Sequence, residues 1–361
     1  MRADKMNGSI NVLKFVFAVM IMLLHGGTFF GYDRFEWFQG AFIYVEWFYI
    51  FIGYMLAKKV LRMEKGLPLW ETTAGVVKSR LIGLIPFYFI SCGIALALKM
   101  STGQVVVLEG WHVHMIVFEF LMMQMTTLSI IPLTDVSWFL SSMWIALVIL
   151  TPLILLLRRK FTRCAILITI ALYLYMAKET GTIYNPSKWL DLSYKGNLRA
   201  VAAICLGMTS YELGEWIRPK LRHPKVEDAV TLVFYVAIAV YTFFWEESRL
   251  TNAIYFIIPF VFMVLVAVQM SKQQQNLIPD NRVTRFLGKF SMALFMNHAY
   301  ILKTIATVHP EIPIFQGMLI GICGSLCTAL CVYFLGNLLM KMPALIRKGQ
   351  KGALLAGKSD K

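Results

Sequence analysis

The residues of this sequence best suited to chemistry are ionisable side chains inside long apolar runs. A Lys or Asp in the middle of a membrane-spanning helix costs about 2.5 to 3.5 kcal/mol on insertion scales, so such residues are candidates for function. Two of them, Lys14 and His25, share the first apolar run. They are 11 residues apart, which on a helix is about 16 Å along the axis and close to three full turns. Both side chains are therefore expected on one face of the same helix.

Each of these two residues also has a purely structural explanation. A lysine near a helix end can extend its ammonium group to the membrane surface, which would account for Lys14. A histidine within a bundle can simply pack or form a hydrogen bond, which would account for His25. The pair alone therefore does not identify a site.

Other apolar runs carry polar residues to the depth of His25. If the chain alternates across a bilayer, Glu46, early in the second run, lies in the same half of the membrane. Asn297 and His298, in the run near residues 286–305, lie there too. Ionisable groups inside a membrane are candidates for function. We expect His25, Glu46 and His298 to form a cluster in this half of the membrane if their helices pack together.

A second set of candidates is cationic and lies towards the opposite membrane face. Lys14 is near the start of the first run, and Lys78 and Arg80 are near the start of the third. Lys and Arg donate charge-assisted hydrogen bonds that suit phosphate groups. The three residues are therefore expected to bind a nucleotide cofactor from the cytoplasm. For Lys78, the ordinary excess of positive charge in cytoplasmic loops is a sufficient alternative explanation.

A bundle of membrane-spanning helices is predicted to position these residues. The 361 residues are 58% hydrophobic and only 15% charged, against about 25% charged in an average soluble domain. Runs of about 20 apolar residues, the length that crosses about 30 Å of hydrocarbon, follow one another almost to the end. The expected fold class is an all-α integral membrane bundle of about ten helices. They are expected near residues 9–30, 38–59, 78–99, 138–157, 161–178, 198–215, 227–245, 251–270, 286–305 and 314–341.

The distribution of Lys and Arg predicts the orientation of this bundle. With the N-terminus inside, 26 of the 35 Lys and Arg residues fall on the cytoplasmic side and eight on the outer side, as the positive-inside rule requires. Both termini are then cytoplasmic. We expect one ten-span domain over residues 1–341 and a basic, disordered cytoplasmic tail over 342–361. The remaining apolar stretch, 115–131, is expected to form an amphipathic or re-entrant helix.

Charge and cysteine content narrow the range of partners. The net charge of +15 is explained by basic loops that face the cytoplasm and anionic lipid, so the expected partner is the lipid bilayer and not nucleic acid. The six cysteines lie inside apolar runs and lack the spacing of a metal site or a disulfide framework. No metal is therefore expected. The sequence does not specify the oligomeric state.

Taken in order, these residues resemble motifs of the acyltransferase-3 family of bacterial membrane enzymes. The first run is similar to that family's signature of a basic residue, ten residues and a histidine. Residues 45–56 resemble its aromatic segment ending in Ser-Gly-aromatic, except that Ile52 replaces the serine. Residues 80–86 resemble its Arg-x-x-Arg-x-x-Pro motif, except that Gly83 replaces the second arginine. Residues 138–142 match its Trp-aromatic-Leu-Ser pattern, and 286–291 its late Leu-Gly-x-x-Ser motif.

This resemblance implies transfer of an acyl group, most often acetyl, from acetyl-CoA to a hydroxyl of a glycan. The acceptor would be a cell-envelope polysaccharide or a lipid-linked sugar, and the enzyme would lie in the bacterial inner membrane. In that scheme His25 acts as general base or transient acyl carrier, oriented by Glu46 or His298. The phosphates of CoA would bind to Lys14, Lys78 and Arg80.

The spacing of Lys14 and His25 is compatible with such a donor, because about 16 Å is comparable with an extended pantetheine arm. The alternative is a multi-span transporter or flippase for an acylated or sugar-linked substrate, since ionisable groups inside a membrane also mark transport paths. The matched Gly- or Pro-broken helices typical of many transporters are not apparent in the sequence.

Overall fold

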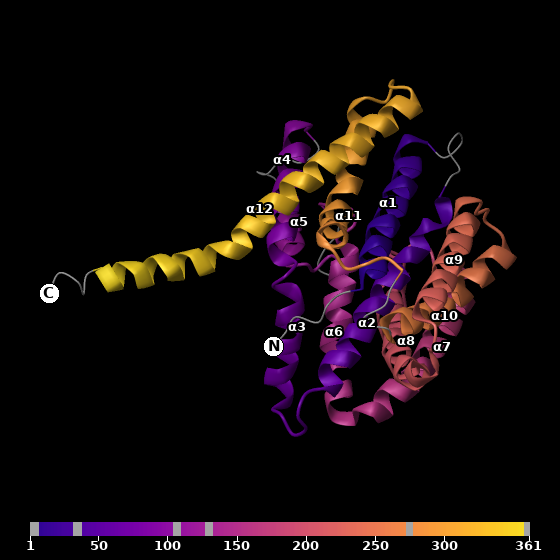
Figure 1. Ribbon diagram of the computed structural model, residues 1–361. Coiled ribbons are helices and arrows are strands. Elements are labelled where there is room, and N and C mark those ends of the chain that lie inside the picture. Colours follow the sequence, from indigo (N-terminus) through magenta and orange to yellow (C-terminus); the bar gives the residue numbers. More distant parts are fainter. Residues whose placement is uncertain (1–6, 32–37, 104–109, 127–132, 272–276, 357–361) are drawn as a thin grey trace.

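The computed structural model describes residues 7–31, 38–103, 110–126, 133–271 and 277–356, and most of them are helical (Figure 1). The long helices are α1 (Gly8–Phe30), α2 (Tyr44–Leu61), α3 (Leu69–Leu81), α4 (Ile85–Ser101), α5 (Gly110–Phe120), α6 (Trp138–Leu157), α7 (Arg159–Thr180), α8 (Lys195–Ile217), α9 (Pro224–Phe243), α10 (Arg249–Ser271), α11 (Arg282–Val308) and α12 (Ile314–Ala356). Two 3₁₀ turns, η2 (Gln39–Ile43) and η3 (Arg218–Lys220), and a hairpin of β1 (Trp189–Leu190) and β2 (Ser193–Tyr194) complete the described elements.

The described helices account for most of the predicted membrane spans. Seven are long and apolar enough to cross a membrane, namely α1, η2 with α2, α6, α7, α9, α10 and α12 as far as Lys341. An eighth arises if α3 and α4, which meet at a bend of 54°, form one broken span. The multi-pass membrane fold is thus confirmed, whereas the predicted number of ten is supported only to seven or eight.

The two remaining predicted spans correspond to α8 and α11, which are long helices but are not apolar enough for the same test. The reason is that both bury polar side chains inside the bundle. Helix α8 carries Asn197 and Arg199, and α11 carries Asn297 and His298, all four of them buried. Polar groups of this kind are tolerated where a helix faces protein and not lipid.

Helices α2 and α8 pack in unusually close contact because each has a glycine where they cross. A Cβ atom added to Gly53 would lie 2.1 Å from the carbonyl oxygen of Ile204, and one added to Gly207 would lie 2.0 Å from that of Ile50. Only a residue without a side chain allows two helix backbones to approach so closely. The position of α2 relative to α8 is therefore fixed at this point.

Helices α1 and α11 lie side by side and run in the same direction. Near their starts, a Cβ atom added to Gly288 would lie 2.3 Å from the side-chain oxygen of Asn11. Further along, the rings of His25 and His298 are neighbours. The two helices are thus in register, and both bring their polar residues to the same levels of the bundle.

Two peripheral helices differ from a simple span. Helix α5 covers only part of the predicted stretch 115–131, of which residues 127–131 lie outside the described residues. Its Glu119 is fully buried, and its carboxylate accepts hydrogen bonds from the backbone N–H groups of Leu133, at 3.1 Å, and Thr134, at 3.3 Å. Helix α12 crosses the bundle and continues away from it to Ala356 (Figure 1). The helix therefore extends into the tail, residues 342–361, that was expected to be disordered.

Candidate functional site

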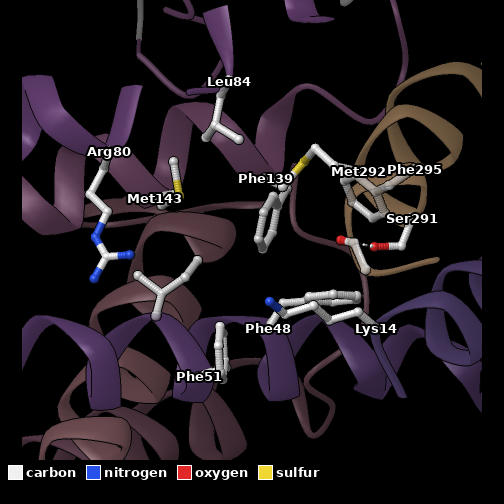
Figure 2. Close-up of a pocket in the computed structure, with 12 residues that line it drawn as sticks. Lys14, Phe48, Phe51, Arg80, Leu84, Phe139, Met143, Ser291, Met292 and Phe295 are labelled. Atoms are coloured by element: carbon white, nitrogen blue, oxygen red, sulfur yellow. Dashed lines mark hydrogen bonds between the residues drawn. The ribbon is translucent and has the colours of Figure 1, made fainter. Parts of the chain in front are cut away.

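A cavity of about 180 Å³ lies among α1, α2, α3, α6 and α11. By comparison, a cavity of about 150 Å³ can hold benzene, so this one can hold a small group or a short length of chain. Most of its wall is apolar. It is lined by Lys14, Phe48, Phe51, Ile52, Arg80, Leu84, Phe139, Met143, Gly288, Ser291, Met292 and Phe295 (Figure 2).

Two cations reach this cavity from opposite sides, Arg80 from the end of α3 and Lys14 from α1 (Figure 2). The ammonium nitrogen of Lys14 lies 4.2 Å from the centre of the Phe51 ring, a cation–π contact. The Nε of Arg80 is buried and has no hydrogen-bond partner among the described residues. Because an unpaired buried donor is costly, this arrangement suits an anionic ligand.

Arg80 lies in the last turn of α3, just before the break between α3 and α4. Helix α3 ends at Leu81, and α4 begins at Ile85 with Pro86 in its first turn. A proline has no N–H group and is well placed at the start of a helix but not in its interior, so the chain turns here. The sequence-predicted partner Lys78 is exposed and does not line the cavity. The structure thus joins Lys14 with Arg80 and leaves Lys78 on the surface.

Gly83 occupies the place of the second arginine in the motif that this segment resembles. It is exposed, and a Cβ atom added to it would meet no atom within 4 Å. It does not line the cavity either. In contrast, Ile52, the other departure from the motifs, forms part of the cavity wall.

His25 and His298 lie next to each other, with ring centroids 5.2 Å apart. The Nδ1 atom of His298 is 3.0 Å from the carbonyl oxygen of Leu294. Because a carbonyl oxygen can only accept, Nδ1 carries the proton and Nε2 has a free lone pair. His298 is fully buried, and its Nε2 has no hydrogen-bond partner in the described part of the chain. The pair thus offers a neutral imidazole in the tautomer of a general base.

Glu46 has a different partner from the one its depth suggested. Its carboxylate accepts two hydrogen bonds from the guanidinium of Arg199, at 2.6 Å from Nε and 2.8 Å from Nη2. Both side chains are almost completely buried, and the guanidinium also lies 5.4 Å from the centre of the Trp138 ring. The structure therefore pairs Glu46 with Arg199 and does not bring it to the imidazoles as a free carboxylate.

Arg199 was not among the candidates. It lies at the outer boundary of the predicted span 198–215, so it was counted with the charges outside the membrane. A signal was available, since a carboxylate inside a membrane bundle requires a cationic partner.

The two serines that open α6 also form structural contacts. Ser141 accepts a hydrogen bond from the backbone N–H of Met125 at 3.0 Å, and Ser142 donates one to Asn197 at 2.9 Å.

The cavity and the imidazole pair are neighbours along α11. Ser291 lines the cavity, and His298 follows it by seven residues, which is about 10 Å and nearly two full turns. Both therefore project from the same face of the helix.

Among the residues that the structure describes, no group of three His, Cys, Asp or Glu side chains is placed to hold a metal ion.

Comparison with known protein families matches residues 7–337 to a family described as an acyltransferase domain. The match therefore includes the helices that supply the cavity and the imidazole pair. Comparisons with curated proteins and with solved structures give no significant match.

Proposed function

Since the chain belongs to the acyltransferase-3 family, we propose that it moves an acetyl or other short acyl group from acyl-CoA to a glycan hydroxyl. Family membership makes it a membrane O-acyltransferase. We propose acetyl-CoA as the donor and a cell-envelope polysaccharide or lipid-linked sugar as the acceptor. A transporter or flippase function has no support from the family match.

The proposed topology has ten spans, with α8 and α11 crossing the membrane beside the seven or eight more apolar ones. It is supported by the Lys and Arg count, which favours cytoplasmic termini. The bacterial inner membrane is the proposed location. The cavity with Lys14 and Arg80 then lies towards the cytoplasm, where acyl-CoA is made. His25 and His298 lie further out, where an envelope acceptor arrives.

In this proposal the CoA phosphates bind Lys14 and Arg80. The unpaired Nε of Arg80 in the cavity wall supports this assignment. The pantetheine arm passes through the cavity towards His25, over the distance of about 16 Å that separates His25 from Lys14. Lys78, on the surface, contributes only long-range attraction to the phosphates.

The proposed reaction uses the imidazole pair as base. His25, with His298 as its partner, removes the proton of the acceptor hydroxyl as the oxygen attacks the thioester carbonyl. A C–O bond forms, the C–S bond breaks, and the proton passes to the departing sulfur to give free CoA. In the variant with an acyl carrier, a nitrogen of His25 attacks first and the acceptor then removes the acyl group. Glu46, bound to Arg199, would act only by holding α2 and α8 in place.

The observation that carries the proposal is the contact of His25 with His298 next to a cavity that contains two cations. The test is mass spectrometry of envelope glycans from cells that express the wild type or His25→Ala. Loss of the acyl modification in His25→Ala, with normal amounts of the protein in the membrane, is expected. His223→Ala, which changes an exposed histidine, is the matched control and should leave the modification intact. Acylation by His25→Ala near the wild-type level would rule out the assignment.

A further inference from the structure

One aromatic side chain borders both the cavity and the imidazole pair. Phe295 lines the cavity, and its ring centroid is 5.9 Å from that of His298. In the part of the chain that the structure describes, no other side chain lining the cavity makes a ring contact with either histidine. Phe295 is thus the lining ring that lies against the imidazole pair.

Two further rings complete the end of the cavity on this side. The ring centroid of Phe295 is 5.2 Å from that of Phe139 and 6.1 Å from that of Phe48, and both of these residues also line the cavity. Phe295 itself is buried, with 6% of its surface exposed. Phe48, Phe139 and Phe295 thus form a cluster of neighbouring rings at the end of the cavity where Phe295 contacts His298.

The packing around Phe295 leaves its ring room to move. On one side it borders the cavity of about 180 Å³. It also borders a second, narrow hollow that has no room for a water molecule and that is lined by residues of α4, α6, α11 and the segment before α6. These residues are Tyr88, Thr134, Val136, Ser137, Leu140 and Met296. The ring therefore has space on the cavity side alone, and a swing into a cavity of this size requires no displacement of a helix, whereas the narrow hollow cannot receive it.

We propose that Phe295 is a gate that makes the enzyme select an acceptor hydroxyl over water. This inference rests on the proposed function. With the ring in the observed position, a thioester in the cavity is out of reach of the imidazoles, so no base activates water against it. Movement of the ring joins the two spaces and allows transfer to a bound acceptor.

The reaction that the gate prevents is hydrolysis. Nε2 of His298 takes a proton from water, whose oxygen forms a bond with the thioester carbonyl carbon. The C–S bond breaks, and the proton passes to the departing sulfur. The products are acetic acid, which ionises to acetate, and free CoA, so no further reactant is needed.

The experiment measures acetyl-CoA hydrolysis by the purified full-length protein in liposomes without any acceptor, by chromatography of free CoA and acetate. Phe295→Ala is expected to hydrolyse acetyl-CoA at least about tenfold faster than the wild type, because the base then reaches the thioester. Adding His298→Ala should return the rate to the wild-type level. A loss of packing alone would not produce a gain that depends on His298.

The matched control is Phe286→Ala, which removes a ring of the same helix that stacks on Phe290 and does not line the cavity. It should leave hydrolysis unchanged. If Phe295→Ala does not elute as folded protein, Phe295→Leu is used, with an expected increase of about threefold. If the Phe295 variant binds acetyl-CoA as tightly as the wild type but hydrolyses it no faster, the gate is overturned and the proposed function is not. Absence of acetyl-CoA binding by the wild type would overturn both.

Discussion

Arg80 and Lys78 are two cations at the end of the same helix, yet only Arg80 lines the cavity. Replacing each by Gln removes one charge and keeps a polar side chain. A hydrogen bond to a charged group contributes about 1.5 to 3 kcal/mol, and every 1.4 kcal/mol is about tenfold in affinity. We therefore expect Arg80→Gln to raise the Kd for acetyl-CoA by roughly 10- to 150-fold. Lys78→Gln should raise it no more than about fivefold, because an exposed charge is screened by solvent.

The assay is isothermal titration of acetyl-CoA into the purified protein in detergent, at about 0.15 M salt and again at a higher concentration. The small effect of Lys78→Gln should vanish at high salt, because the screening length for exposed charges falls from about 8 Å at 0.15 M to about 3 Å at 1 M. Most of the effect of Arg80→Gln should persist, since the guanidinium is partly buried. Equal losses for the two variants, or a Kd for Arg80→Gln within threefold of the wild type, would refute the reasoning.

Two further predictions concern the packing that holds the site. Gly53→Ala should lower the apparent melting temperature by several degrees or prevent folding, because its Cβ would lie 2.1 Å from the Ile204 oxygen. Gly93→Ala, whose Cβ meets no atom within 4 Å, should melt like the wild type; equal melting of both variants would contradict the close contact. Glu46→Ala should destabilise the protein by about 3 to 5 kcal/mol, because it leaves the buried Arg199 without its partner. Replacing both residues by Met should recover much of this loss, as measured by thermal unfolding in detergent, whereas an inactive Glu46→Ala protein of normal stability would instead support a catalytic carboxylate.

The meeting of His25 with His298 illustrates what the sequence could predict. Helical rise fixes the depth of a residue within its span, and alternation of the spans fixes the direction, so both residues could be assigned to the same half of the membrane. Those rules give depth but not the neighbours of a helix in the plane of the membrane. The contact itself depends on the packing of α1 against α11, which the glycine at position 288 permits.

The partner of Glu46 shows the limit of the same rules. Arg199 is 153 residues away in the sequence, and its position close to a predicted span boundary gave it a place among the outer loop charges. Boundaries uncertain by a few residues decide whether such a charge counts as buried or exposed. Similarly, Lys78 and Arg80 have equal charge and nearly equal depth, but they are two residues apart on α3, so their side chains lie about 200° apart around the helix axis. Which of them faces the cavity depends on how α3 packs in the bundle.

The crossing of α2 and α8 at Gly53 also makes the two sides of the donor cavity mechanically unequal. Phe48, Phe51 and Ile52 project from a helix whose backbone is held in close contact with that of α8. Arg80 projects from the end of a helix at a 54° bend, where the surroundings of Gly83 are empty. The cavity thus has a stiff side and a compliant side. Entry of the donor and release of CoA should deform the compliant side, so substitutions at the α3–α4 bend should alter turnover rates while those in α2 alter which acyl groups fit.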